Sequence, residues 1–200
     1  MRQTALLQQK PELIIPNFTP TLETIKIAIR AKPKGQERPD MMVARDKDGN
    51  PVKNPKNGRF VMIPHKSDDQ KADEQTLAAL LAPYRIPIPI SGPIYFGLRC
   101  YMAIPNSCPE HYKSCVPKGI GQNAWFQWAA RNNVVQPLRT PDFDNVLKHI
   151  KDIMTKLSFW RDDAQIVRIA GASGKYYGDV PGYEITVQYW AELQLGWRGM

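Results

Sequence analysis

Residues 142–157 have the sequence DFDNVLKHIKDIMTKL, and this stretch decides the fold more clearly than any other. Its apolar residues recur at alternating steps of four and three: Phe143, Leu147, Ile150, Met154 and Leu157. This spacing places them on one face of an α-helix. Asp142 stands directly before the first of them, where a short polar side chain commonly caps a helix. The stretch therefore predicts an amphipathic helix that packs its apolar face on the rest of the protein.

Strands are predicted on both sides of this helix. Residues 22–30 place three isoleucines on alternate positions, and residues 94–104 and 183–190 show a similar alternation. Shorter strands are predicted at 59–63 and 166–172. We expect the strands at 166–172 and 183–190 to form an antiparallel hairpin around the glycine-containing loop between them.

A second helix is predicted to begin after Ser67, which is a typical N-cap followed by acidic residues. Pro83 ends this helix near Ala82. Residues 86–93 alternate proline and isoleucine and are therefore extended. The apolar stripe of the second helix is expected to consist of Leu77, Leu80 and Leu81.

Two segments lack a clear period. Residues 31–58 contain Lys-Pro, Asp-Gly-Asn-Pro and Asn-Gly, which indicate turns and loops. Residues 105–140 show no dominant pattern. We expect an α+β fold, with a small antiparallel or mixed sheet packed by two main helices. The chain would consist of an N-terminal arm at 1–21, a single domain at 22–190 and a tail at 191–200.

Composition excludes several classes of protein. The chain has 200 residues, of which 42% are hydrophobic and 23% are charged, so wholesale disorder is excluded. No apolar run approaches the roughly 20 residues that a membrane-spanning helix needs, and no secretion signal follows Met1. Three cysteines cannot all pair within one chain, which favours free thiols and a cytoplasmic location.

The charge balance indicates a polyanionic partner. The formal net charge is +8 and the sequence pI is about 9.4. Ten basic residues and four acidic ones lie between Arg30 and Lys66. A nucleic-acid surface and an ordinary solvated loop both fit this excess of charge.

Acidic residues gather at the helix and just after it. Asp144, Lys148 and Asp152 lie at i, i+4 and i+8, and therefore on one stripe of the helix. Asp162 and Asp163 begin the next strand, and they return to the start of the helix only if the connection folds back.

Such a cluster suits a hard divalent cation. Carboxylates a few ångströms apart repel one another, and Mg²⁺ removes that cost while it keeps several waters. The bound ion activates water and stabilises a leaving oxygen at a phosphodiester, and Lys148 would contact a phosphate oxygen. The alternative is structural: an Asp-x-Asp caps many helices, and Asp144, Lys148 and Asp152 would form a solvated salt-bridge ladder.

The run DFDNVLK at 142–148, followed by FWRDDAQIV at 159–167, closely resembles the RusA family of Holliday junction resolvases. Members of that family carry a D-x-D-N-x-x-K motif that opens a helix, followed by W-x-D-D-A/S-Q-V. Two separated motifs agree in both identity and spacing, so the resemblance is specific. It extends over residues 142–190.

The resemblance implies a small α/β fold acting as a homodimer that cleaves four-way branched DNA by paired nicks, with Mg²⁺ or Mn²⁺ as cofactor, in a bacterium or a phage-infected cell. The sequence has no glycine loop of the kind that binds nucleotides, so no nucleotide cofactor is expected. It implies that Asp142, Asp144 and Asp163 bind the metal and that Lys148 is the essential lysine. Additional candidates are Asn145, Asp152 and Asp162. The chain departs from the shortest members by its longer 31–58 and 105–140 segments, and by Pro141, where some members have a basic residue.

We expect a basic surface to match the shape of the branched DNA. Phe60 or Trp125 would wedge into the crossover, although such aromatics more often belong to a core. The basic residues predicted to contact DNA are Arg30, Lys32, Lys34, Arg38, Arg59, Arg139, Lys151 and Arg161.

Other chemistries are less well supported by the sequence. A PD-(D/E)-x-K nuclease needs a lysine where Ala164 and Gln165 follow the acids. Cys108, His111 and Cys115, together with Cys100, have irregular spacing for zinc. His149 is predicted to pack or to contact a phosphate, and no phosphate-binding glycine loop is present. A non-catalytic branched-DNA-binding protein, and a flap or single-strand nuclease that uses the same acids, remain as alternative functions.

Overall fold

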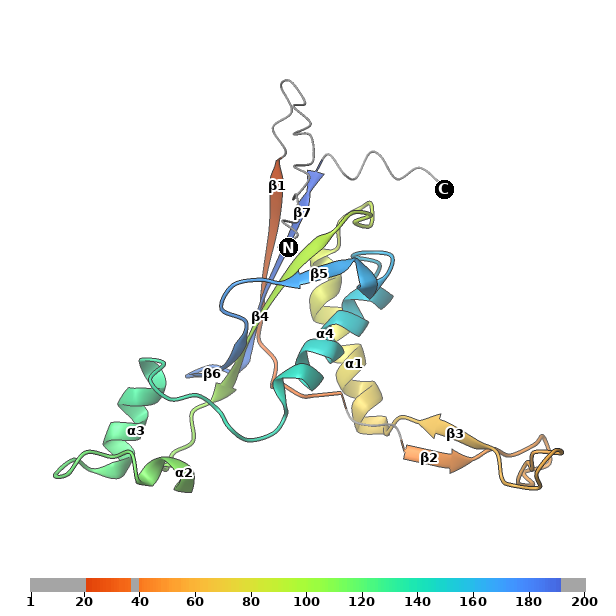
Figure 1. The fold of residues 1–200 in the computed structure, drawn as a ribbon, viewed down its shortest axis with the longest axis horizontal. Helices are drawn as coiled ribbons and strands as arrows, with labels where there is room; N and C mark the ends of the chain where they lie inside the picture. Colours follow the sequence, from red (N-terminus) through yellow and green to blue (C-terminus); the bar gives the residue numbers. More distant parts are fainter. Residues whose placement is uncertain (1–20, 37–39, 192–200) are drawn as a thin grey trace, which may run out of the picture.

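The computed structural model describes residues 21–36 and 40–191, so the expected N-terminal arm and C-terminal tail lie almost wholly outside the described residues. A five-stranded mixed sheet forms the centre (Figure 1). Strands β1 (Leu22–Ile29) and β4 (Ile94–Ala103) each pair antiparallel with β7 (Gly182–Trp190), which lies between them. The three strands predicted at 22–30, 94–104 and 183–190 are therefore confirmed.

The other edge of β4 carries two short strands in succession. β5 (Ile166–Ile169) pairs parallel with the first residues of β4, and β6 (Gly174–Gly178) pairs parallel with the last. The predicted hairpin of 166–172 with 183–190 is therefore wrong, because β7 pairs with β1 and β4 instead. The segment expected to be a loop, between 172 and 183, contains the strand β6, which pairs with the edge of β4.

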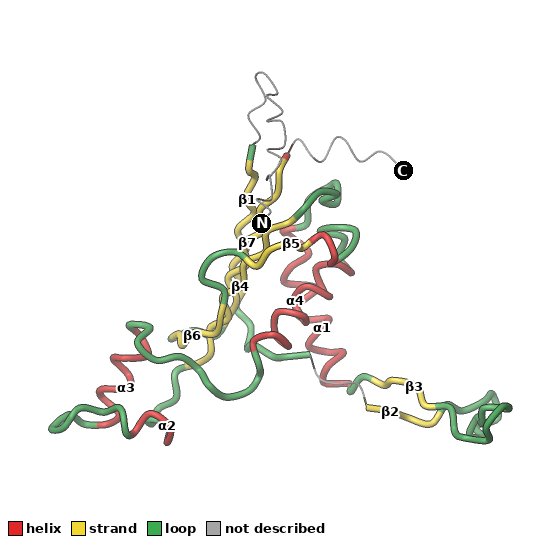
Figure 2. Tube along the Cα trace, viewed as in Figure 1, coloured by secondary structure: helices red, strands yellow, loops and turns green. Residues whose placement is uncertain are grey.

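Two helices cover one face of the sheet, as expected (Figure 2). α1 (Asp68–Leu81) begins after Ser67, whose Oγ accepts the amide of Gln70 at 3.1 Å, and a short 3₁₀ turn, η1 (Ala82–Tyr84), follows it. Leu77 and Leu81 are fully buried, whereas Leu80 is 36% exposed and lies outside the apolar stripe.

α4 (Phe143–Lys156) packs beside α1, with its buried face rotated from the predicted one. Ile150 and Met154 are fully buried as expected, while Phe143, Leu147 and Leu157 are only partly buried. Val146 and Ile153 fill the core in their place. The stripe is broader than the residues at steps of four and three because α4 packs both on the core of the sheet and against α1 beside it.

The segment predicted as loops at 31–58 contributes to a projecting two-stranded hairpin (Figure 1). β2 (Asp40–Val43) pairs antiparallel with β3 (Met62–His65), which replaces the strand predicted at 59–63. Bridges from Lys53 to Phe60 and from Arg45 to Pro51 extend the ribbon. Turn residues do lie here, but at the tip, where the Asp46 carboxylate accepts the amides of Asp48 and Asn50 at 2.9 Å.

Residues 105–140 form a small helical lobe. α2 (Glu110–Lys113) and α3 (Gln122–Arg131) pack on the end of β6 around a second core, which contains Cys108, Phe126 and Tyr177. Trp125 packs against this core, which agrees with the structural interpretation of that residue. No helix among the described residues is both long and apolar enough to cross a bilayer.

Candidate active site

The start of α4 presents two carboxylates to solvent. Asp142 occupies the N-cap position, where its carbonyl accepts the amide of Val146 at 3.1 Å. Its side chain makes no capping hydrogen bond, and both Asp142 and Asp144 are exposed. An N-cap aspartate ordinarily accepts a backbone amide through its carboxylate. Capping therefore does not explain the carboxylate of Asp142.

Lys148 lies one turn after Asp144 and is also exposed. Within the described ranges, the ion pairs include neither of these two residues. Asp152, one turn further along, accepts a hydrogen bond from Gln36 Nε2 at 3.1 Å. The salt-bridge ladder considered as an alternative is not formed, so Asp144 and Lys148 can both face a ligand.

The segment Lys34-Gly35-Gln36 crosses the first turns of α4. The amide of Gln36 donates to the Asn145 carbonyl at 3.2 Å, and its side chain reaches Asp152. A Cβ added at Gly35 would lie 3.0 Å from the Cβ of Pro141 and 3.1 Å from that of Asn145. Only glycine allows this close approach without a shift. The segment therefore holds the turn that carries Asp142 and Asp144.

The segment at residues 34–36 is also anchored to α1 and α4 by a polar network around the buried side chain of His149. His149 is 1% exposed, and its Nε2 lies 3.0 Å from Asp73 Oδ2 on α1. Lys34 Nζ lies 3.6 Å from the other oxygen of Asp73, and the Lys34 amide donates to the Tyr183 hydroxyl at 3.0 Å. His149 thus packs inside, which was one of its two predicted roles, and its ring is not exposed to a phosphate. Lys34, predicted to bind DNA, lies in this ion pair.

The second acidic motif folds into a 3₁₀ turn, η2 (Asp163–Gln165). Asp162 caps it, accepting the Ala164 amide at 2.8 Å, while the Gln165 side chain accepts the Asp162 amide at 3.0 Å. Trp160 Nε1 donates to Thr155 Oγ1 at 2.7 Å, which fixes the turn against the end of α4. Asp162 therefore has a structural role. Asp163 is exposed, and its side chain is not part of this capping box.

The two acidic groups lie at opposite ends of α4. Asp142 and Asp144 are at its start, and Asp163 follows its last turn. A helix of 14 residues at 1.5 Å per residue is about 21 Å long. The connection does not fold back, and no group of three metal-ligating side chains occurs in the described part of the chain. One chain does not bring the three predicted ligands together.

The donors nevertheless suit a hard cation. Asp142 and Asp144 supply carboxylate oxygens that capping and ion pairing leave unused within the described part of the chain. Mg²⁺ is often held by one or two carboxylates, with water filling its other positions. The start of α4 therefore fits a divalent ion whose remaining positions are filled by water or by an oxygen ligand from elsewhere.

The predicted basic residues are distributed over several elements. Arg139 is exposed shortly before Asp142, and its carbonyl accepts Lys175 Nζ at 2.8 Å. Arg161 is exposed directly before the capped turn, Lys151 is half-buried on α4, and Arg59 is exposed on the hairpin. Arg30 and Lys32 are exposed after β1, and Arg38 lies outside the described residues. Phe60 is 50% exposed on the hairpin, under Lys53 at 5.3 Å.

The cysteines do not form a zinc site. Cys100 belongs to the main core and Cys108 to the second core, whereas Cys115 is exposed. Burial raises the pKa of the Cys100 thiol to about 11, which disfavours the thiolate that metal binding requires. Sequence reasoning missed Gly35, Gln36, Asp73 and Lys175, because these residues lie outside any periodic pattern or motif.

Three similarities to known proteins accompany this geometry. A family model described as "Endodeoxyribonuclease RusA" matches residues 31–188. "Uncharacterized protein YqaN" of Bacillus subtilis (strain 168) is 23% identical over 169 residues, which cover 84% of this chain and 97% of that protein. "Crossover junction endodeoxyribonuclease rusA" of Lactococcus phage r1t is 42% identical over 43 residues, which cover 22% of this chain and 27% of the phage protein.

Proposed function

The chain belongs to the RusA family of endodeoxyribonucleases, and from this premise we propose that it resolves four-way DNA junctions by paired, metal-dependent nicks in the cytoplasm of a bacterium or a phage-infected cell. The observation that carries the proposal is the start of α4, where Asp142 and Asp144 are exposed and uncapped beside Lys148. These are the residues of the first family motif.

The proposed active site is shared between two chains. Asp142 and Asp144 of one protomer would be joined by Asp163 of the partner subunit. A two-fold axis crossing α4 near its middle sets two such helices antiparallel, so that each start faces the other's end. This arrangement is supported by the position of Asp163 beside the end of α4. It creates two identical sites, as symmetric cleavage of two strands requires.

Mg²⁺ or Mn²⁺ held by these carboxylates would supply Lewis-acid activation of water at the scissile phosphodiester. Lys148 lies one turn from Asp144 and donates to a phosphate oxygen, which stabilises the charge that develops there. Arg139 and Arg161 each lie beside one acidic group, where they hold the DNA backbone against the repulsion of the carboxylates.

The hairpin of β2 and β3 would grip a duplex arm of the junction. It projects from the domain, and its outer half exposes Arg45, Lys47, Lys53, Lys56 and Arg59 (Figure 1). A two-stranded ribbon fits the major groove of B-DNA, and basic side chains along it contact phosphates. The Lys53 ammonium lies 5.3 Å from the centroid of the Phe60 ring, and this contact holds its positive charge close to the ribbon.

Cleavage of a labelled four-way junction tests this function. The wild-type protein should nick two opposite strands with Mg²⁺, and EDTA should abolish the reaction. Asp144→Asn should abolish nicking while junction binding in Ca²⁺ persists. Asp152→Asn is the matched control, because Asp152 is on the same helix but is bonded to Gln36. Full nicking by Asp144→Asn would contradict the proposal.

The same assay separates the alternative functions. A non-catalytic branched-DNA-binding protein would bind the junction and leave it intact with either metal. A flap or single-strand nuclease would cut those substrates in preference to the junction when the two compete. Paired nicks at the junction, with the linear duplex left intact, support only the resolvase.

A further inference from the structure

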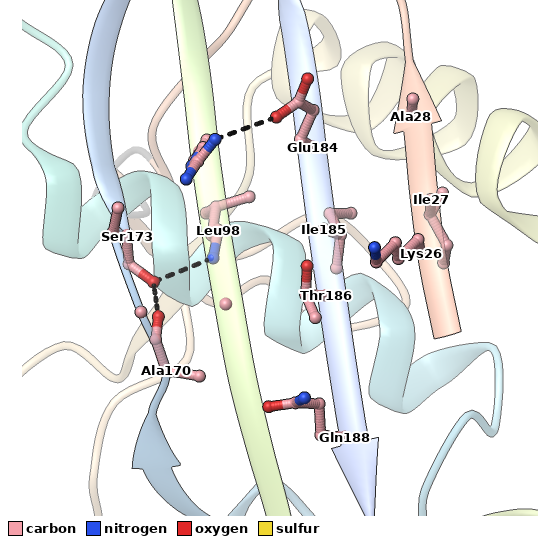
Figure 3. Close-up of a pocket in the computed structure, with 14 residues that line it drawn as sticks. Lys26, Ile27, Ala28, Leu98, Ala170, Ser173, Glu184, Ile185, Thr186 and Gln188 are labelled. Atoms are coloured by element: carbon pink, nitrogen blue, oxygen red, sulfur yellow. Dashed lines mark hydrogen bonds and ion pairs between the residues drawn. The ribbon is translucent and has the colours of Figure 1, made fainter. Parts of the chain in front are cut away.

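One face of the central sheet is left open by the helices. Alternation along β1, β4 and β7 buries Ile27, Leu98 and Ile185 against α1 and α4, and turns their neighbours to the opposite side. Register aligns Lys26, Thr186 and Gly97 in one row of that side. Figure 3 looks onto it, with helices behind the strands. We call this side of the sheet the open face.

The open face is basic. Its charged side chains within the strands are Lys26 on β1, Arg99 on β4, Arg168 on β5 and Glu184 on β7. Arg99 lies 3.8 Å from Glu184, but both are about half-exposed, and such a pair holds its partners weakly. Three cations against one anion favour a polyanionic ligand.

Tyrosine rings accompany these cations. The Arg168 guanidinium lies 6.0 Å from the Tyr95 ring centroid, and that of Arg99 lies 5.9 Å from the Tyr176 ring. Tyr176 also lies 5.8 Å from Tyr101. Tyr95 and Tyr101 are six residues apart on β4 and therefore stand on one face, about 20 Å from each other. Two aromatic groups thus flank the centre of the open face.

A hollow separates the two groups. It has a volume of about 560 Å³, and side chains from β1, β4 and β7 line it together with the loop at Ala170–Ser173 (Figure 3). Gly97, Ala28 and Thr186 are small residues, so their side chains leave the hollow unfilled. Ser173 fixes the loop, because its hydroxyl accepts the Leu98 amide at 3.1 Å. Lys26 and Gln188 supply polar groups at its border.

We propose that the open face binds single-stranded DNA, with bases stacked at Tyr95 and at the Tyr101–Tyr176 pair, and with the phosphates held by Lys26, Arg99 and Arg168. Aromatic rings interleaved with basic side chains on a sheet are the features that bind unpaired strands. A duplex hides the faces of its bases and cannot use the rings. A second copy of the chain would set this basic face against itself across a two-fold axis.

This site is separate from the start of α4, which lies on the other side of the sheet, and it does not depend on the metal. The test is fluorescence anisotropy with fluorescein-labelled oligothymidylate in EDTA, on the full chain carrying Asp144→Asn. Tyr95→Ala should weaken binding by about fivefold or more, the loss expected for one stacked base. Tyr95→Phe should restore it, because the ring is sufficient for stacking.

A charge-matched pair of variants tests the phosphate contacts. Lys26→Ala with Arg168→Ala should weaken binding and lower its salt dependence, whereas Lys113→Ala with Lys118→Ala, on the helical lobe, removes the same charge and should change little. Equal weakening by the two pairs, or equal binding by Tyr95→Ala and wild type, would overturn the proposal. Dissociation of a dimer by Tyr95→Ala in sedimentation would also overturn it, by identifying the face as a subunit interface.

The outcome is independent of the nuclease assignment. Failure of the nuclease would appear as an intact junction in Mg²⁺ while oligothymidylate still binds. Failure of the open face would appear as nicking without the predicted loss of single-strand binding.

Discussion

Asp144 lies in the first turn of α4, and Asp163 lies just beyond the last turn of the same helix. Their separation follows from the length of the helix and from the turn that Trp160 and Gln165 fix at its end. The proposed nuclease site, which uses both carboxylates, therefore combines acids from two chains.

Adjacent acids in the second motif should differ sharply on substitution. Asp163→Asn should lower junction cleavage by about 10²-fold or more, because it removes a proposed metal ligand. Asp162→Asn should cleave nearly as well as the wild type, since asparagine also caps a helical turn. Initial rates at saturating Mg²⁺ measure both. The reverse order of the two effects would assign the metal to Asp162.

The close packing at Gly35 makes a second prediction. Gly35→Ala forces a methyl group against Pro141 and Asn145, and such overpacking costs about 1–3 kcal/mol of unfolding free energy. Cleavage should fall as well, because the turn that carries Asp142 must move. Gly121→Ala, which meets no atom within 4 Å, is the control. Urea denaturation measures the free energy of unfolding, and the junction assay measures cleavage. Equal values for Gly35→Ala and Gly121→Ala in both measurements would show that the close packing at Gly35 is unimportant.

The buried pair of His149 and Asp73 should contribute more to stability than the exposed part of the same network. Asp73→Ala leaves a buried imidazole nitrogen unpaired, and we expect a decrease of about 1–3 kcal/mol in unfolding free energy. Lys34→Ala should cost less than about 1 kcal/mol, because half of its side chain is in water. Urea denaturation curves compare the two variants. A larger decrease for Lys34→Ala would contradict the account.

The hairpin should contribute to affinity through charge. Replacing Lys53, Lys56 and Arg59 by alanine should weaken junction binding. For each DNA phosphate that the variant no longer neutralises, the slope of log affinity against log salt should become shallower by about 0.9. The measurement is a salt titration in Ca²⁺. A slope equal to that of wild type would remove the hairpin from the DNA interface.

Thiol reactivity checks the two cores. Cys115 is exposed and should react rapidly with an aromatic disulfide reagent in the native protein, whereas Cys100 and Cys108 are buried and should react only on unfolding. The raised pKa of Cys100 adds to its protection, because the thiolate is the reacting form. Cys115→Ser should abolish the fast phase. A fast phase that persists in Cys115→Ser would show that a core opens readily.

The sequence predicted those elements whose signal is local. The isoleucine alternation of β1, the Ser67 cap and Pro83 each specify their element by themselves. Strand pairing was less accessible, because β7 alternates identically whether it pairs with β5 or lies between β1 and β4. The hairpin of β2 and β3 was hidden by turn residues that occupy its tip.

In the candidate site, too, local sequence signals were readable and tertiary contacts were not. Motif spacing predicts the acids and Lys148 and places the acids before and after the helix. It does not encode whether the connection brings Asp163 back to the start of α4, which the structure shows it does not. The support of that turn depends on Gly35 and Gln36, which meet α4 across more than a hundred positions of the chain. Such interactions arise from tertiary packing and leave no periodic signature.

Subunit mixing tests the shared active site most directly. A heterodimer is purified from one chain carrying Asp144→Asn and another carrying Asp163→Asn, with a different affinity tag on each. If each site combines the start of one α4 with Asp163 of the partner subunit, one site keeps all its wild-type acids and the heterodimer nicks one strand of the junction. Either homodimer should be inactive. If the heterodimer is as inactive as the two homodimers, the acids act within one chain, and the shared site is contradicted.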